Sequence, residues 1–195
     1  MSEFFLELFS EEIPASLQKN AREDILKNFK EFFQKKKINF EKNFSYSTPN
    51  RLIIFFDGIE NQIEQKEEEL RGPKADARPQ ALEGFMRSNN FVKNDIYEKQ
   101  TEKGLFFFAK KPGATIKTFD LLNENISAII DKLKWKKSMK WSDFNLYWGR
   151  PLKSIFGVFD NKNLIFQHHH LKSSNYTYLD KDFESKTKVF KDFKS

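Results

Sequence analysis

The chain has no cysteine and only 7 glycines among its 195 residues. Without cysteine it has no disulfides, no thiolate zinc ligands and no cysteine nucleophile. Seven scattered glycines could hardly build a phosphate-binding glycine-rich loop, and neither an HExxH zinc motif nor a nucleophile elbow occurs. We therefore expect no catalytic residue in this chain.

Long hydrophobic runs are also missing. No run reaches the roughly 18 apolar residues that a membrane-spanning helix needs. Glu3, Glu7, Glu11 and Glu12 interrupt the apolar N-terminal segment, which rules out the pattern of a signal peptide. The absence of cysteine fits a reducing compartment. We expect a cytoplasmic protein with no membrane contact.

Basic residues are in excess, with 34 Lys and Arg against 28 Asp and Glu and a formal net charge of +6. This balance favours a polyanionic partner over an acidic protein. The chain also has 23 Phe. Because the codons of Phe, Lys and Asn are A/T-rich, genome composition explains this abundance without any role in stacking on bases or lining an RNA groove.

Hydrophobic periodicity predicts an α+β fold of antiparallel hairpins with amphipathic helices packed on the sheet. The N-terminal strand is expected at 4–9, and the helix that follows begins around Pro14 and ends near the lysines at 35–37. Glu11 and Glu12 are interpreted as first-turn acids that favour the helix dipole. The remaining helices are expected at 79–87 and 118–133, the latter capped by Thr118. Paired strands are expected at 40–46 with 52–56, 96–99 with 105–109, and 152–159 with 164–168.

The domain organisation is expected to be simple. One α+β region should cover residues 1–180, with a weak internal boundary in the Gly- and Pro-containing loop at 71–79. Residues 181–195 are predicted to be the start of a charged helix that is cut off.

Three adjacent histidines, His168, His169 and His170, are the clearest candidate metal ligands. Neighbours on a strand point to opposite faces, so at most two of them share a face. No cysteine can complete a site, although distant carboxylates could. We interpret these histidines as solvated residues at a strand end and predict no metal site.

The stretch 132–150 interleaves lysines with all three tryptophans of the chain. Ammonium groups can neutralise phosphates and indole rings can stack on bases. Equally, large aromatic side chains bury well and lysine stems can lie over them to reach water. We favour core packing for the tryptophans and leave open whether the lysines face RNA or solvent. Arg51, which follows a Thr-Pro-Asn turn, is a candidate clamp for phosphate or carboxylate.

Short motifs occur in a fixed order across nearly the whole chain. They comprise Glu11, Glu12 and Pro14 of Ser-Glu-Glu-Ile-Pro; Thr48, Pro49 and Arg51 of Thr-Pro-Asn-Arg-Leu; Arg71, Gly72 and Pro73; Ala81, Gly84, Phe85 and Arg87; Met139, Lys140 and Trp141; and Arg150 with Pro151. This series resembles the N-terminal part of the β subunit of bacterial heterotetrameric glycyl-tRNA synthetase, or glycine–tRNA ligase. That subunit is several hundred residues longer, so we expect the chain to be an N-terminal piece of it.

The resemblance implies a role in the ATP-dependent attachment of glycine to tRNA-Gly. In that family the α subunit carries the class II catalytic core and uses ATP with magnesium, whereas the β subunit contributes tRNA binding. The implied partners are the α subunit, tRNA-Gly and the remaining β-subunit domains, and we expect no cofactor to be bound by this segment. The candidate tRNA-facing residues are Arg51, Arg71, Lys74, Arg87, Lys136, Lys137, Lys140 and Arg150. The alternative is a non-catalytic basic RNA-binding or scaffold domain.

Three positions depart from the family pattern. Lys140 replaces an arginine, and Ser154 stands where a tryptophan usually follows the Arg-Pro pair. After Ser174 the family has a Gly-His-Arg-Phe step, which is absent here, so its role is not carried over. The family's C-terminal parts, including the anticodon-binding region, are also absent from the chain.

Overall fold

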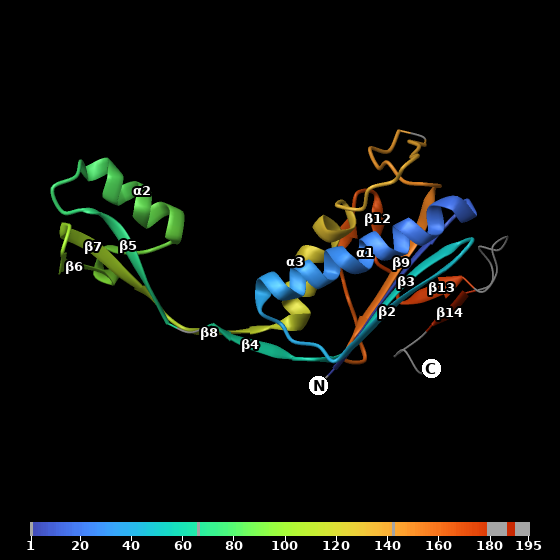
Figure 1. The fold of residues 1–195 in the computed structure, drawn as a ribbon, viewed down its shortest axis with the longest axis horizontal. Helices are drawn as coiled ribbons and strands as arrows, with labels where there is room; N and C mark the ends of the chain where they lie inside the picture. The colour runs from blue at the N-terminus through green and yellow to red at the C-terminus, as the bar shows by residue number, and fades with distance from the viewer. Residues whose placement is uncertain (1, 66, 142, 179–186, 190–195) are drawn as a thin grey trace. The chain divides into compact units, whose positions relative to one another are not determined.

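The computed structural model describes residues 2–65, 67–141, 143–178 and 187–189 (Figure 1). The chain forms two compact units, and the smaller one comprises Glu64–Ile116. The larger one is built from the described residues on either side of that insertion. The boundary predicted at 71–79 lies inside the smaller unit. No helix in the described part of the chain is long and apolar enough to cross a membrane.

A five-stranded antiparallel sheet forms the centre of the larger unit, with the strand order β10-β9-β1-β3-β2. The N-terminal strand β1 (Ser2–Ser10) lies in the middle and pairs with β3 (Arg51–Ile59) and β9 (Leu152–Phe159). The edge strands are β2 (Lys42–Thr48) and the short β10 (Lys162–Asn163). The N-terminal segment is thus the most enclosed strand of the sheet, which explains its apolar composition.

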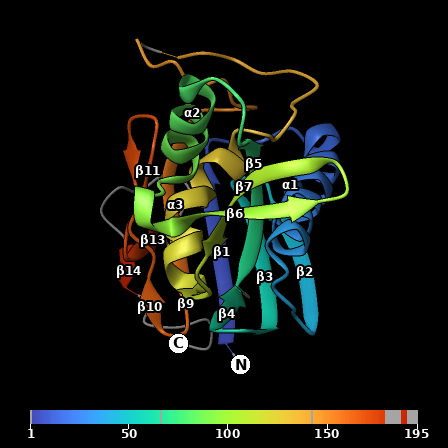
Figure 2. The same ribbon diagram turned by 90° about the vertical axis from the view of Figure 1, so that its left-hand side faces the viewer.

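Two helices, α1 (Ala15–Lys36) and α3 (Thr118–Ile130), lie side by side on one face of this sheet (Figure 2). Helix α1 buries Leu17, Ala21, Ile25, Phe29, Phe32 and Phe33, the positions that its three- and four-residue spacing predicts. Phe4 of β1 lies 5.3 Å from Phe29 and Phe33 lies 4.9 Å from Phe56, between ring centroids. The abundant phenylalanines therefore build the core between helix and sheet.

Short strands complete the larger unit. They are β11 (Gln167–His168) paired with β12 (Leu171–Lys172), and β13 (Tyr176–Tyr178) paired with β14 (Thr187–Val189). Strand β13 contributes Tyr178, whose ring lies 5.1 Å from that of Phe9, and Phe9 points to the sheet face opposite α1.

The smaller unit is a three-stranded antiparallel sheet with the order β5-β7-β6. Its strands are β5 (Glu68–Lys74), β6 (Ile96–Thr101) and β7 (Gly104–Lys111), and helix α2 (Pro79–Asn89) contacts β5. A single turn of 3-10 helix (Lys93–Asp95) precedes β6. The chain enters through β4 (Gln62–Gln65) and leaves through β8 (Ala114–Lys117), and these two strands pair with each other.

The α+β class is confirmed, with three helices and antiparallel sheets in the described residues. The three expected helices and the 40–46/52–56 and 96–99/105–109 hairpins are present, with ends shifted by a few residues. The spacing of aromatic and aliphatic residues was sufficient to predict these elements, because each of them buries one face.

Several local predictions were wrong. Helix α1 begins at Ala15 with no acid in its first turn, so the helix dipole does not explain Glu11 and Glu12. Thr118 does not cap α3; its hydroxyl donates to the carbonyl of Glu60 instead. Residues 71–74 belong to β5 and are not a loop.

Two further predictions fail near the C-terminus. The strand that returns from β9 is only Lys162–Asn163, and the predicted 164–168 strand is replaced by this strand and β11. Part of the charged helix predicted at 181–195 is instead strand β14, and the rest of that prediction lies outside the described residues.

Candidate functional site

Three of the sequence motifs meet at one end of the central sheet. The backbone N–H of Ser10 donates to Asn50 O at 2.8 Å, and that of Ile13 donates to Pro49 O at 2.6 Å. The N–H of Glu11 donates to Pro151 O at 2.9 Å. The Ser-Glu-Glu-Ile-Pro step is therefore held between the Thr-Pro-Asn-Arg turn and the Arg-Pro pair, which we call the motif junction (residues 10–14, 48–51 and 150–151).

The acids of the motif junction face outward. Glu11 and Glu12 are exposed, and Glu11 Oε1 lies 3.6 Å from Lys153 Nζ on β9. Pro14 is the residue that precedes α1, where its fixed φ and missing N–H cost the helix nothing. Thr48 accepts a hydrogen bond from the N–H of Asn50 at 3.3 Å, which closes the hairpin turn.

Next to this junction the half-buried Arg51 forms an ion pair with the buried Glu7. Its Nε donates to Glu7 Oε2 at 3.2 Å, and its guanidinium carbon lies 4.7 Å from the Phe9 ring centroid. The guanidinium also bonds the carbonyl of Tyr178, and the Thr177 hydroxyl donates to Glu7. Arg51 thus holds the carboxylate of Glu7 within the chain.

Burial raises the pKa of Glu7 above its usual value, while the Thr177 hydrogen bond and the Arg51 charge act in the opposite direction. Sequence reasoning missed this cluster. Glu7 is the one charged residue in the otherwise apolar run 4–9, and that isolation was a usable signal.

The tryptophan prediction is confirmed for Trp148, which is only 2% exposed. Its backbone N–H donates to Met139 O at 3.1 Å, and its backbone carbonyl accepts from the Met139 N–H at 2.8 Å. Its ring lies 5.0 Å from that of Trp135. Trp135 and Trp141 are half-buried. Backbone hydrogen bonds thus join Met139 to Trp148, and the Trp148 ring packs against Trp135.

The lysines of this stretch lie in water. We call the exposed Lys132, Lys134, Lys136, Lys137 and Lys140 the lysine segment. Beside it, Tyr147 is 63% and Phe144 39% exposed. Arg150 is half-buried and donates to the neighbouring carbonyl of Gly149 at 3.0 Å. Cationic groups and accessible rings are therefore presented by the same stretch of chain.

The other candidate cations lie in the smaller unit. Arg71 and Lys74 are exposed on β5 and lie 3.6 Å and 6.0 Å from the ring centroid of Phe106. Arg87 is exposed in the last turn of α2. A side chain at Gly72 would come within 3.0 Å of the Phe85 ring, so these two motif positions are packed against each other. Of the remaining motif residues in this unit, Pro73 is half-buried in β5 and Gly84 is exposed in α2.

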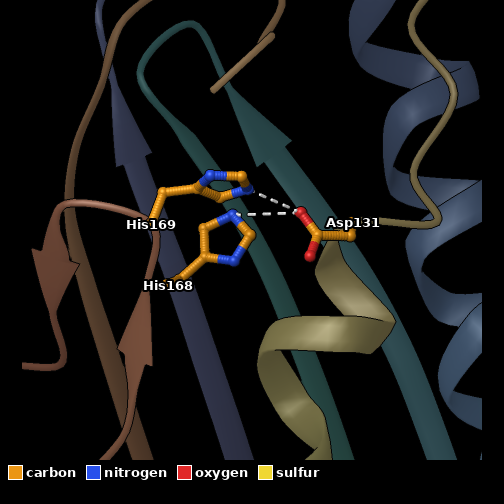
Figure 3. A group of neighbouring side chains, drawn as sticks. All are labelled: Asp131, His168 and His169. Carbon is orange, nitrogen blue, oxygen red and sulfur yellow. Dashed lines mark hydrogen bonds and ion pairs between the residues drawn. The ribbon is translucent and has the colours of Figure 1, made fainter. Parts of the chain in front are cut away.

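The histidines are arranged differently from the prediction. His168 is fully buried, so the interpretation of a solvated histidine is wrong for this residue. Its Nδ1 lies 3.0 Å from Ser127 Oγ, and its Nε2 lies 4.0 Å from Asp131 Oδ1. His169 Nε2 lies 2.9 Å from the same carboxylate oxygen (Figure 3).

Burial lowers the pKa of His168 to about 4, against the smaller opposing effect of Asp131. Its imidazole is therefore neutral at physiological pH. His170 turns away to stack on Phe144, with 3.6 Å between ring centroids. No spacing rule connects residue 131 to residue 168, so the sequence offered no signal for this cluster.

Comparison with known proteins agrees with the motif series. A family model described as the glycyl-tRNA synthetase β subunit matches residues 4–195. The glycine–tRNA ligase β subunit of Rickettsia felis is 37% identical over 178 residues, which cover 91% of this chain and 27% of that protein. That of Rickettsia canadensis is 35% identical over 198 residues, covering 100% of this chain and 30% of that protein. The chain thus spans less than a third of the length of these relatives, and it belongs to the glycyl-tRNA synthetase β-subunit family.

Proposed function

We propose that this chain helps glycine–tRNA ligase to attach glycine to tRNA-Gly by binding the tRNA and by assembling with a catalytic α subunit. Membership of the β-subunit family supports the proposed role in this reaction. The exposed lysine segment, anchored by the buried Trp148, is the observation that supports tRNA binding. On this proposal the α subunit supplies the chemistry with ATP and magnesium, and this chain has no assigned step in it.

The chemistry of the lysine segment fits a phosphate backbone. Ammonium groups that neutralise phosphates release condensed counterions, which makes binding strong at low salt and weak at high salt. The exposed ring of Tyr147 can stack on an unpaired base beside the lysine segment. The Met139–Trp148 bridge holds the flanks of this surface, which lowers the entropy lost when RNA orders it.

The cations of the smaller unit form a second candidate contact. Arg71, Lys74 and Arg87 are exposed, and Phe106 lies under the first two. A guanidinium held over an aromatic ring keeps its edge free for a phosphate. We propose that these residues meet the tRNA backbone separately from the lysine segment.

Assembly with an α subunit has its own support. The exposed apolar side chains of Ile165 (81%) and Met139 (40%) give the larger unit surfaces that a partner subunit could cover. A scaffold role without RNA binding is the second candidate function, and co-elution with the α subunit in the absence of any tRNA affinity would favour it.

The test is a titration of the chain with tRNA-Gly at several salt concentrations, followed by fluorescence anisotropy. A Lys136/Lys137/Lys140→Ala variant should bind more weakly, and its slope of log K against log salt should be shallower by about 2–3, as expected for three lost contacts.

The matched control is Lys30/Lys35/Lys42→Ala, which removes the same charge from exposed lysines outside the lysine segment. We expect this control to retain the wild-type slope. Equal weakening of both variants would reduce the effect to net charge, and no binding by any of the three proteins would contradict the proposal.

A further inference from the structure

The cluster of Asp131, His168 and His169 is not used by the proposed function. One ligand atom from each residue lies within 4.8 Å of the other two (Figure 3). Asp131 directly follows the last residue of α3. His168 lies in β11, and His169 lies in the turn that follows it. Two elements far apart in sequence therefore direct imidazole nitrogens and a carboxylate to one point.

A second observation points to a missing ligand. His168 Nε2 is buried and has no hydrogen-bond partner among the described residues. It points toward the cluster, with Asp131 Oδ1 at 4.0 Å. Buried polar atoms are nearly always satisfied in native proteins, by protein, water or ion. His168 Nε2 is therefore an unpaired buried nitrogen that faces Asp131, and a ligand bound by the three residues together would satisfy it.

A contact at the second ring nitrogen, Nδ1, fixes the orientation of the His168 side chain. Its Nδ1 lies 3.0 Å from the hydroxyl of Ser127, which leaves Nε2 to face the cluster. Ser127 and Asp131 are four residues apart at the end of α3, so one face of the helix supplies both the orienting group and the carboxylate. Metal-bound histidines typically have such a partner on the second nitrogen.

We propose that His168 Nε2, His169 Nε2 and the Asp131 carboxylate bind one divalent transition-metal ion of the Zn²⁺ class. Two imidazoles and a carboxylate suit this ion, with water in the fourth position. With metal–ligand bonds of about 2.0–2.1 Å, tetrahedral ligands stand about 3.3 Å apart. Asp131 Oδ1 now lies 2.9 Å from His169 Nε2 and 4.0 Å from His168 Nε2, and all the ligand atoms lie within 4.8 Å of one another, so these atoms must shift to form the site.

The ion would act as a structural clamp. It replaces the direct His169–Asp131 contact and ties the C-terminus of α3 to the β11–β12 hairpin. The lysine segment begins directly after Asp131, so the ion also fixes the point from which that segment departs.

The test is calorimetric titration of the metal-free chain with Zn²⁺. We expect one ion per chain, a higher unfolding temperature with zinc, and affinity at least tenfold weaker in Asp131→Asn and His169→Asn. Ser127→Ala, which removes only the orienting hydroxyl, should weaken binding by about 10–100-fold. His170→Asn is the matched control and should bind as the wild type does, because its ring stacks on Phe144 outside the cluster.

The control separates a built site from a run of histidines. A histidine run that captures zinc by itself would bind without Asp131 and would weaken equally in His169→Asn and His170→Asn, and either result would overturn the proposal. A readout without variants is the visible spectrum of the Co²⁺ form. Intense bands of a four-coordinate ion are expected, and the weak bands of hydrated Co²⁺ would overturn the proposal as well.

Discussion

At the residue scale, Glu7 places a carboxylate on the sheet face opposite α1, where Arg51 and Thr177 satisfy it. Burial raises its pKa above 4.5, so the folded chain holds the proton more tightly than the unfolded chain. The stability that protonated Glu7 contributes is therefore fully present below pH 4.5 and is lost as the pH rises through the folded pKa. At neutral pH, Arg51 offsets the cost of the buried charge.

The variant Arg51→Met tests this balance. It leaves an ionised, buried Glu7 without its cation, which should lower the free energy of unfolding by about 3 kcal/mol at pH 7. The loss should be smaller at pH 4, below the ordinary glutamate pKa of 4.5, because Glu7 with its raised pKa is then protonated in the folded state. Urea unfolding at the two pH values measures both numbers, and Lys35→Met, at an exposed position, should change stability by no more than about 0.5 kcal/mol. A loss that does not depend on pH would contradict the assignment.

Gly149 is a second residue whose identity the fold requires. A Cβ there would stand 2.5 Å from the Trp135 ring, in the packed pair with Trp148. Gly149→Ala should therefore destabilise the protein by about 1–3 kcal/mol. Gly84→Ala is the matched control, since nothing lies within 4 Å of its Cβ and its place in α2 favours alanine by about 0.5–1 kcal/mol. Chemical unfolding of both variants should give changes of opposite sign, and equal effects would contradict this packing.

At the scale of elements, periodicity predicted what one-sided burial determines. The buried face of α1 matches its spacing because each apolar position meets the sheet. Strand β5 was missed because its polar sequence 68–74 is extended only through pairing with β7, a tertiary effect that no local pattern records. The first turn of α1 was misplaced because the backbone N–H groups of Ser10, Glu11 and Ile13 donate to the carbonyls of residues 49–50 and 151, and these residues do not enter the helix.

The turn between β9 and β10 offers a prediction at this scale. Asp160 and Asn161 have φ of 49° and 59°, a region that asparagine and glycine tolerate and β-branched residues do not. Asn161→Val should reduce stability by about 1–2 kcal/mol, whereas Asn161→Gly should stay close to the wild type. Urea unfolding compares the two, and a tolerated valine would show that this turn adopts another backbone conformation.

At the scale of the whole molecule, the sequence motifs identified the family but not the geometry that joins them. Motif segments far apart in sequence share backbone hydrogen bonds at the motif junction, Ser10 with Asn50 and Glu11 with Pro151, and Gly72 lies against Phe85. Such contacts could not be predicted from one sequence, because spacing along the chain carries no information on pairing across it. Whether the lysines of this stretch face RNA or solvent was likewise left open, because a sequence pattern alone does not name a partner.

The central claim is that the lysine segment contacts tRNA-Gly, and lysine footprinting tests it without any substitution. The chain is treated with an amine-modifying reagent with and without tRNA-Gly at low salt, and each lysine is quantified by mass spectrometry. We predict that tRNA protects Lys136, Lys137 and Lys140 and that high salt removes the protection, while Lys30, Lys35 and Lys42 react equally in all samples. Bound tRNA that leaves the lysine segment as reactive as before would contradict the account.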